Sequence, residues 1–524
     1  MSWIPAQLTG NILTVLIFLP LAGALLLVFL PKGKPRLLRD ATLLVTALEF
    51  LLSLPVAIGL DGTSAAMQFV RKVPWIPEYG ISYHVGVDGI SLWLLMLTTF
   101  LMPLTILSTY TSVEKHVKEF MIFMLLLEVG MVGVFLAADL FLFYIFWELV
   151  LIPMYFLIGV WGSDRRIYSA IKFFLYTFAG SVLMLVAIIA LYFHHYAVTG
   201  VYSTDLFAMY ELSIPVKLQF WMFAAFALAF AFKVPMFPFH TWLPDAHVDA
   251  PTAGSVILAA VLLKMGTYGF LRLAIPLFPV AAVDLAPVLA TLAVVGIVYG
   301  ALVAMVQKDI KKLVAYSSVA HLGFVMLGMF AFNLQGIEGS ILQMVNHGIS
   351  TGALFLLVGI LYERRHTRLI SEFGGLAKGL PVYAACFMII TLSSIGLPGL
   401  NSFVGEFLIL VGAFKPMPAL TVVAASGVIF SAVYMLWMFQ RVMFGPITNE
   451  KNRHLPDMKA REVAYILPIL LFVFWIGIYP QTFLRKMDGS VEALVLRIET
   501  KRQAALSEAP PGETLLARYF DIRK

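Results

Sequence analysis

Fourteen runs of about 20 apolar residues, separated by short polar segments, divide this chain of 524 residues. An α-helix needs a run of about this length to cross the hydrocarbon core of a bilayer. The runs centre near residues 20, 49, 100, 128, 150, 182, 228, 264, 294, 321, 350, 397, 431 and 473. Hydrophobic residues make up 61% of the chain and charged residues 13%, which excludes a water-facing globular surface. The sequence therefore predicts an all-α integral membrane protein with about 14 transmembrane helices.

Lysine and arginine are distributed unevenly between alternate loops. Twenty-one of them, from Lys32 to Arg461, fall in the loops of one side. Five fall on the other side: Arg71, Lys72, Lys217, Arg272 and Lys415. Because basic loops stay cytoplasmic, the first side is predicted to be cytoplasmic, and an even helix count places both termini on the other side. The tail after Tyr479 is predicted to be extramembrane. Basic residues scattered over short loops form no single basic face, so no nucleic acid partner is expected.

Seven ionisable side chains are predicted to lie at membrane depth. Among the basic residues, only Lys233 and Lys264 remain inside helices once the loops are assigned. The acidic and histidine members are Glu128, Glu148, His321, His347 and Glu406. A charge at the bilayer centre costs about 2.5–3.5 kcal/mol on insertion scales, so such residues usually mark ion or proton pathways. We therefore predict a proton-conducting path. Structural pairing or bonding to the backbone remains the alternative, most of all for His321, His347 and Glu128.

Two helices are predicted to break within the membrane. Residues 232–238 read Phe-Lys-Val-Pro-Met-Phe-Pro, and residues 396–401 read Gly-Leu-Pro-Gly-Leu-Asn. Proline removes a backbone donor and interrupts the helix. Lys233 is predicted to lie in the last turn before one break and Glu406 after the other, where the half-helix dipoles favour a cation and an anion.

Broken helices in corresponding positions are typical of inverted repeats. Helices 4–8 (residues 111–280) and 9–13 (residues 281–445) are therefore predicted to form two inverted five-helix repeats, with helices 7 and 12 broken. Three helices precede them in residues 1–110, and helix 14 with the tail occupies residues 446–524. Asp139 and Asp249 are predicted to cap the helices that follow them.

Several short strings resemble catalytic or ligand motifs but favour packing. Residues 348–352 match a nucleophile elbow, yet they lie inside a predicted spanning helix with no preceding strand, which indicates close helix packing. His240, Asp245 and His247 could ligate a metal, but the residues between them predict a packed loop, and no metal is expected. The single cysteine, Cys386, excludes cysteine-ligated clusters. No glycine-rich nucleotide loop is present, so the chain is expected to hold no cofactor.

The chain resembles the antiporter-like subunits of respiratory complex I, the proton-pumping NADH:quinone oxidoreductase, which are related to Mrp-type sodium/proton antiporters. The resemblance covers essentially the whole chain. It rests on the string Lys233-Val-Pro-Met-Phe-Pro-Phe-His240-Thr-Trp-Leu-Pro-Asp245-Ala-His247 and on Glu148 in Phe-Trp-Glu-Leu. The carboxylate of Glu406, after Gly-Leu-Pro-Gly-Leu-Asn-Ser-Phe-Val-Gly, is similar to the M-type branch of this family, whose sister chains tend to carry lysine there.

This resemblance implies proton translocation through Glu148, Lys233, Lys264, His321, His347 and Glu406. It implies a translocase subunit without a redox centre, with NADH, FMN, iron–sulfur clusters and quinone held by partner subunits. Other membrane-arm subunits, including sister antiporter-like chains, are the expected partners, and a bacterial inner membrane is the expected location. A subunit of a Mrp-type antiporter and a structural scaffold remain as alternatives. Ion exchange by the chain alone in liposomes would favour the antiporter, and normal pumping by a Lys233→Ala variant would favour the scaffold.

Overall fold

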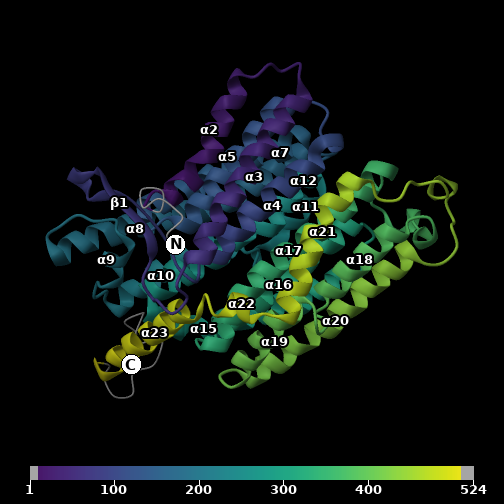
Figure 1. Cartoon of the computed structure of the whole chain (residues 1–524). Helices are drawn as coiled ribbons and strands as arrows, with labels where there is room; N and C mark the ends of the chain where they lie inside the picture. Colours follow the sequence, from purple (N-terminus) through teal and green to yellow (C-terminus); the bar gives the residue numbers. More distant parts are fainter. Residues whose placement is uncertain (1–9, 509–524) are drawn as a thin grey trace.

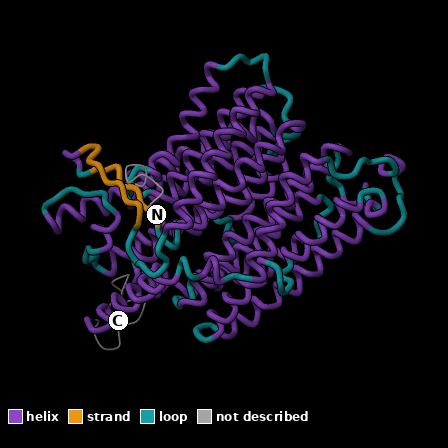
Figure 2. Tube along the Cα trace, viewed as in Figure 1, coloured by secondary structure: helices purple, strands orange, loops and turns teal. Residues whose placement is uncertain are grey.

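The computed structural model describes residues 10–508, and α-helices make up most of this part of the chain (Figures 1 and 2). Within residues 10–508, 13 helices are long and apolar enough to cross a membrane. Thirteen of the predicted centres each fall in one of them. The remaining centre, residue 397, falls between two shorter apolar helices, α18 (Pro381–Ser394) and α19 (Asn401–Phe414). The predicted all-α membrane architecture is confirmed.

The N-terminal region contains three spanning helices, α2 (Ile12–Phe29), α3 (Pro35–Gly59) and α4 (Leu92–Ser112). An antiparallel hairpin, β1 (Gln68–Ile76) and β2 (Ile81–Val87), lies between α3 and α4 and was not among the predicted elements. Lys72 and His84 face each other across this hairpin and both contact Asp205 Oδ2, at 2.6 and 2.8 Å. Asp205 caps α9 (Leu206–Tyr210), so the hairpin is fixed to the loop that follows the sixth span.

The next five spans form the first predicted repeat. They are α5 (Val117–Leu136), α6 (Leu140–Leu149) with α7 (Leu151–Trp161), α8 (Arg166–Thr199), α10 (Val216–Lys233) with α11 (Trp242–Asp249), and α12 (Thr252–Ile257) with α13 (Leu263–Gly269) and α14 (Ile275–Leu277). Asp139 caps α6 as predicted, because its carboxylate accepts from the backbone N–H groups of Phe141 and Leu142. The predicted break after Lys233 is also confirmed.

Helix eight, Thr252–Leu277, is the most enclosed of these spans, together with α17 (Leu334–Arg365). Two π-helical segments, Leu258–Leu262 and Phe270–Ala274, join its three α-helical pieces. A side chain at Gly348 of α17 would lie 2.9 Å from the carbonyl oxygen of Ala260 in the first of these segments. The prediction that the glycines of residues 348–352 serve close helix packing is confirmed at Gly348.

The second predicted repeat comprises α15 (Pro279–Met305), α16 (Ile310–Met329), α17, the pair α18 and α19, and α20 (Pro418–Met443). The break between α18 and α19 occurs where the sequence predicts it. Gly396 and Gly399 adopt φ values of 76° and 90° there, which favour glycine. The broken helix is fourth in each block of five. The inverted relation of the two blocks, and the domain boundaries drawn from it, stay predictions.

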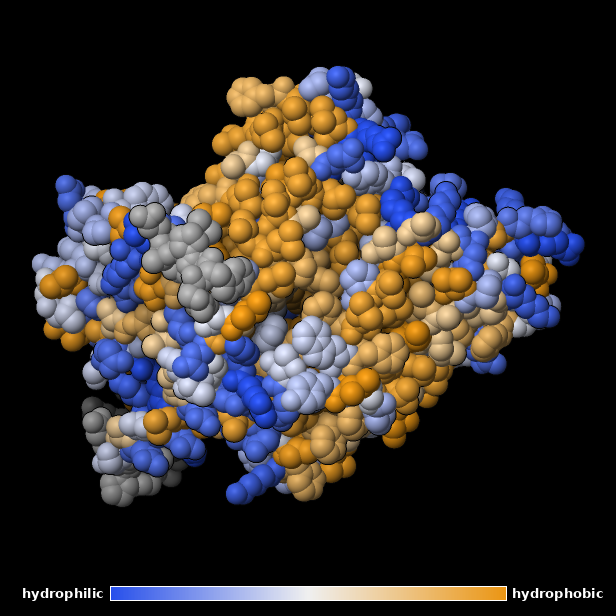
Figure 3. All heavy atoms as spheres, in the orientation of Figure 1, coloured by the Kyte–Doolittle hydropathy of each residue, from blue (hydrophilic) through white to orange (hydrophobic). Residues whose placement is uncertain are grey.

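The last elements are the spanning helix α21 (Ala460–Ile478), α22 (Gln481–Leu484) and α23 (Asp488–Glu508). Helix α23 does not qualify as a span and packs against α14, α15 and α17 near the C-terminal end in Figure 1. The predicted tail continues to residue 524, and its residues 509–524 lie outside the described part. On the face shown in Figure 3, apolar side chains form a broad band, with hydrophilic side chains gathered on opposite sides of it. This pattern suits a protein that crosses a bilayer.

Candidate functional site

Lys264 lies in α13, between the two π-helical segments of helix eight, and is fully buried. Its Nζ donates to the carbonyl oxygen of Ala259 at 2.7 Å and lies 2.6 Å from Nδ1 of His347 on α17. An ammonium group can only donate, so Nδ1 of His347 is the acceptor when Lys264 is charged. A π-helical turn releases backbone carbonyls from their usual partners, and the Ala259 carbonyl is used here to hold the ammonium. Two sequence-predicted residues are therefore in direct contact.

His347 leads to two further predicted residues. The rings of His347 and His321 have their centres 5.9 Å apart, and Nδ1 of His321 lies 2.8 Å from Oε1 of Glu406. All three side chains are buried. The Nε2 atoms of both histidines have no hydrogen-bond partner among the described residues. Lys264, His347, His321 and Glu406 thus form one continuous series, which we call the central series.

Amide and hydroxyl groups position Glu406 at the end of the central series. Gln343 Nε2 donates to Oε1 of Glu406 at 2.9 Å, and Asn346 Nδ2 donates to the carbonyl oxygen of Asn401 at 2.8 Å. Asn401 is the first residue of α19, so Glu406 stands in the second turn after the break, as predicted. Gly396, within the break, leaves room for this carboxylate: a Cβ there would lie 2.9 Å from Oε2 of Glu406. The break therefore shapes the pocket of the carboxylate.

Lys233 and Glu148 form a separate group. Lys233 is the last residue of α10, and its ammonium lies 5.2 Å from the ring centre of Trp147 and 5.9 Å from that of Phe173. Among the described residues, neither Nζ of Lys233 nor Oε1 of Glu148 has a hydrogen-bond partner. The two charges nevertheless interact electrostatically. Aromatic faces stabilise a cation, so this lysine rests on ring faces and on the field of a carboxylate rather than in a closed ion pair.

The two groups approach each other where α10 packs on α13. A Cβ at Gly266 would lie 3.0 Å from Cβ of Lys233, so the two helix backbones are close at this point. No hydrogen bond joins Lys233 to Lys264 within the part of the chain that the structure describes. His247 lies in this region too, fully buried and stacked on Phe355 with ring centres 4.6 Å apart. Both of its nitrogens have no partner among the described residues.

Glu128 is not part of the central series. Its fully buried carboxyl faces the equally buried carboxyl of Glu49 on α3. The sequence analysis missed Glu49, although an acidic residue inside an apolar run is the same signal that identified Glu128. Gln343 and Asn346 were missed for a different reason, because uncharged polar residues are common in spanning helices and only their neighbours reveal their role.

Two basic residues predicted to lie in loops are buried in spanning segments, and that prediction is wrong. Arg272 lies in the second π-helical segment, with Nη2 2.5 Å from Oδ1 of Asp88 and Nε donating to the hydroxyl of Tyr268 at 3.2 Å. Lys311 lies in the first turn of α16, where its Nζ donates to the carbonyl oxygen of Ala250 at 2.6 Å. Hydropathy locates the ends of a span only to within a few residues, so Lys233 and Lys264 are not the only basic residues inside helices.

The predicted helix cap at Asp249 is also wrong. Asp249 is the last residue of α11, and its carboxylate accepts from the hydroxyls of Ser163 and Ser169, at 2.7 and 2.5 Å. Pro251 occupies the cap position of α12. The two serines precede and begin α8, so Asp249 joins α11 to α8 instead of starting the next helix.

The residues considered as metal ligands do not gather at one point. Asp245 is bonded to Arg165 and Lys172, at 2.9 and 2.7 Å. His240 packs against the ring of Tyr299, with ring centres 5.0 Å apart, and His247 stacks on Phe355. Among residues 10–508, no three histidine, cysteine, aspartate or glutamate side chains are arranged to hold a metal ion.

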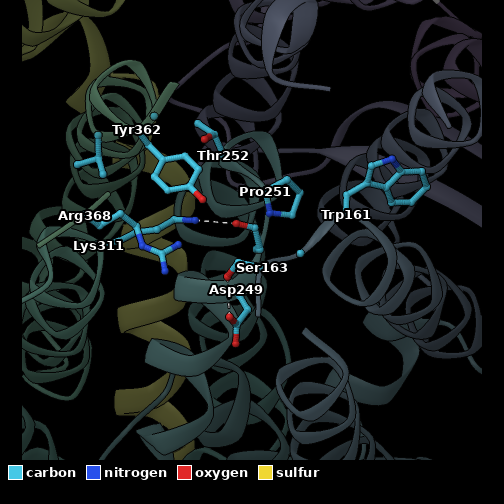
Figure 4. A pocket seen from close by; sticks show the side chains of 12 residues that line it. Trp161, Ser163, Asp249, Pro251, Thr252, Lys311, Tyr362 and Arg368 are labelled. Atoms are coloured by element: carbon cyan, nitrogen blue, oxygen red, sulfur yellow. Dashed lines mark hydrogen bonds between the residues drawn. The ribbon is translucent and has the colours of Figure 1, made fainter. Parts of the chain in front are cut away.

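A cavity opens beside Lys311 on the side predicted to be cytoplasmic. Its volume is about 140 Å³, and Figure 4 shows Asp249, Thr252, Lys311 and Tyr362 around it. A larger hollow of about 1050 Å³ adjoins it and shares Thr252 and Tyr362 among its lining residues. Hydrophilic space therefore extends from this side to the buried ammonium of Lys311.

Comparison with known proteins places this geometry in context. Residues 137–432 match a family described as NADH:quinone oxidoreductase/Mrp antiporter, and residues 15–134 match the amino terminus of NADH-ubiquinone oxidoreductase chain 4. NADH-quinone oxidoreductase subunit M of Rhodobacter capsulatus is 49% identical over 502 residues, covering 93% of this chain and 96% of the relative. Chain 4 of NADH-ubiquinone oxidoreductase from Marchantia polymorpha is 46% identical over 484 residues, covering 92% and 97%.

Solved structures agree in fold. A chain of respiratory complex I from Thermus thermophilus with bound NADH is 32% identical, with a TM-score of 0.85, and the match covers 93% of this chain and 99% of that one. A chain of the Mrp complex from Dietzia sp. DQ12-45-1b has a TM-score of 0.81 at 19% identity, covering 94% and 99%. At that identity the second likeness concerns the fold alone.

Proposed function

Because the chain belongs to the NADH:quinone oxidoreductase/Mrp antiporter family, we propose that it carries protons across the membrane as a subunit of an NADH:quinone oxidoreductase. The carrying observation is the central series, in which four buried titratable side chains on helix eight, α16, α17 and α19 face one another in turn. Buried ionisable groups in spanning helices are expensive and typically mark proton routes.

Each member of the central series has a donor or acceptor aimed at the next. Lys264 donates its proton to Nδ1 of His347 along the 2.6 Å contact. His347 then releases a proton from Nε2 toward His321, across a ring separation that a single water molecule bridges. His321 passes a proton from Nδ1 to Oε1 of Glu406. One proton enters and one leaves in each step, and the Gln343 amide keeps the carboxylate oriented.

Glu148 and Lys233 control the start of the central series. Two unit charges about 6 Å apart attract by roughly 2.8 kcal/mol at an effective dielectric constant of about 20. When the charge of Glu148 is withdrawn, the buried ammonium of Lys233 loses this stabilisation and releases its proton toward Lys264. Carrying one charge across 100 mV costs about 2.3 kcal/mol. One such event is therefore matched to one proton and not to two.

Protons reach the central series through the cavity of Figure 4. Lys311 lines this cavity, and His247 interacts electrostatically with both Lys311 and Lys264. The unpartnered ring nitrogens of His247 are free to accept and pass on a proton. This geometry supports entry from the side with the basic loops and exit beyond Glu406.

Membership of the family supports further proposals about the setting of the chain. The chain works beside other membrane-arm subunits, including sister antiporter-like chains, in a bacterial inner membrane with both termini on the non-cytoplasmic side. NADH, FMN, iron–sulfur clusters and quinone belong to partner subunits, and electron transfer there drives the Glu148–Lys233 switch. A Mrp-type sodium/proton antiporter subunit is the alternative, because the Mrp chain shares the fold.

Replacement of Lys264 by methionine tests the proposal. Methionine retains most of the apolar volume and removes the transferable proton, so proton uptake per NADH oxidised should fall at least about tenfold, equivalent to about 1.4 kcal/mol. The assay uses the whole complex in sealed liposomes with a pH-sensitive dye. Lys308→Met, on the exposed loop before α16, is the matched control.

Normal proton uptake by Lys264→Met in an assembled complex would exclude this route. Sodium-dependent proton exchange by the chain without NADH would instead support the antiporter alternative.

A further inference from the structure

The buried face of α3 is polar, which is unusual for a helix packed inside a membrane protein. Thr42, Thr46, Glu49 and Ser53 recur at helical spacing and are all fully buried. The three hydroxyls donate to carbonyl oxygens of α3 itself, and Ser53 also contacts the hydroxyl of Thr99 on α4 at 2.9 Å. Hydroxyls bonded to their own helix are satisfied at little cost. Glu49 remains as the one residue of this face that its own helix does not satisfy.

The partner of Glu49 is Glu128 on α5. The two carboxyl groups repel each other electrostatically and lie within hydrogen-bonding reach of one another. None of their four oxygens receives a hydrogen bond from any other group in the described part of the chain. A carboxylate can only accept, so a hydrogen bond between the two requires a proton on one of them.

The helices around this carboxyl pair offer no cation to neutralise it. Helices α2 and α4 contain no charged residue at all. The basic residues of α3 and α5 are confined to the first turns, at Arg36, Arg39 and Lys118. Helix α13 also packs on α5, but its Lys264 is committed to Ala259 and His347.

Glu148 on α6 is the other charged group near α5, and the body of α5 separates it from the pair. Gly130 and Gly133 of α5 pack against α6, where a Cβ on Gly130 would lie 2.6 Å from Val150. At about 100° per residue, Glu128 points roughly 200° away from Gly130. The carboxyl pair therefore faces away from Glu148 and does not belong to the Glu148–Lys233 group.

Two adjacent carboxylates without a cation cannot both stay ionised at membrane depth. Each buried charge costs about 2.5–3.5 kcal/mol on insertion scales, and the mutual repulsion adds to that cost. A proton held between them removes one charge, turns repulsion into a hydrogen bond and satisfies the exposed oxygens. We propose that Glu49 and Glu128 form a proton-binding site, separate from the central series, that holds at least one proton at neutral pH.

Infrared spectroscopy of the purified complex tests the site without using its activity. A protonated carboxyl group has a carbonyl stretching band well separated from the carboxylate bands, and this band shifts when H₂O is replaced by D₂O. Parent, Glu49→Gln, Glu128→Gln and the double glutamine variant are compared at neutral pH. Glu119→Gln is the matched control, because Glu119 lies on the same helix in an ion pair with Lys32 at 2.5 Å.

We expect the parent-minus-double difference spectrum to contain the acid band of at least one carboxyl group per chain. Each single variant should shift that band, because the proton then lies between a carboxyl and an amide. The control should lose only carboxylate bands. An acid band that is unchanged in both single variants would overturn the proposal, even where the double variant does not assemble. Because the readout is a proton at rest, failure of the central series in pumping assays leaves this test unaffected.

Discussion

Glu406 receives hydrogen bonds from two different helices, from His321 on α16 and from Gln343 on α17. A carboxylate held by two donors is both fixed in position and poised to take the proton of one of them. The residue after the break of α18 and α19 is therefore the natural end of the central series.

Glu406→Gln separates these two roles. The amide oxygen still accepts from both donors, so the complex should assemble, but the amide takes up no proton. We expect proton uptake per NADH to fall at least about tenfold, which corresponds to about 1.4 kcal/mol. Liposome assays at matched expression measure it. Glu372→Gln, whose carboxylate accepts from Asn449 away from the central series, serves as control. Equal pumping by parent and Glu406→Gln would make Glu406 structural.

At the residue scale, the sequence identified most charged members of the site but not their pairing. Lys264, His321, His347 and Glu406 are recognisable because ionisable residues are rare in apolar runs. That Lys264 contacts His347, 83 positions away, depends on the rotation of two helices about their axes, and hydropathy carries no information about that rotation. Arg272 and Lys311 were assigned to loops because both lie close to the ends of their spans.

At the scale of single elements, the broken helix twelve depends on two glycines with different surroundings. Both Gly396 and Gly399 have positive φ, but a Cβ at Gly396 meets Glu406 at 2.9 Å, whereas one at Gly399 meets nothing within 4 Å. Replacing either by alanine costs about 1–2 kcal/mol of backbone strain. Only Gly396→Ala also displaces the carboxylate.

We therefore expect Gly396→Ala to reduce proton pumping severalfold more than Gly399→Ala when complex content is equal. Pumping rate divided by the amount of assembled complex gives the comparison, and the Gly399 variant controls for strain. Equal losses in the two variants would show that the shape of the break matters and the approach to Glu406 does not.

The hairpin of β1 and β2 depends on one ionised aspartate. Burial raises the pKa of Asp205, but hydrogen bonds from His84 and Lys72 outweigh it and hold the pKa well below its ordinary value. An aspartate with a lowered pKa stabilises the folded state above its unfolded pKa of about 3.9, and this contribution is lost as the pH falls from there through the folded value. The clamp should thus be at full strength from about pH 5 upward.

Asp205→Asn should speed hydrogen exchange of the hairpin amides about tenfold at neutral pH, since a hydrogen bond to a charged group contributes about 1.5–3 kcal/mol. The ratio of variant to parent should shrink in acid, below the unfolded pKa. Exchange measured by mass spectrometry at several pH values follows this ratio. Glu78→Gln, in the exposed turn of the same hairpin, removes a carboxylate without touching the clamp. A ratio that stays constant down to pH 3 would contradict the assignment.

Element prediction succeeded where length decides and failed where pairing decides. Runs of about 20 apolar residues leave little choice but a spanning helix. The strand β1, in contrast, contains Arg71, Lys72 and Pro74, and proline within a run argues against a strand. Its stability comes from the clamp at Asp205, 133 positions from Lys72, which no local pattern shows.

At the scale of the whole molecule, the distribution of basic loops predicts the orientation in the membrane. Lys34 precedes α3 and Lys415 follows α19, and both are exposed. In a background with Cys386→Ala, a membrane-impermeant maleimide should label Lys415→Cys from the non-cytoplasmic side and leave Lys34→Cys unlabelled in sealed right-side-out vesicles. Permeabilised vesicles, in which both should react, provide the control. The reverse pattern would invert the proposed direction of transport.

The π-helical segments beside Lys264 mean that the aim of this side chain is set by counting residues. A π-turn accommodates one more residue than an α-turn. Removing a single residue from Leu258–Leu262 would restore regular geometry there and rotate everything that follows by about 100°. The ammonium would then turn away from His347 although no member of the central series had changed. Helix eight is therefore vulnerable to deletions that no comparison of residue identities would flag.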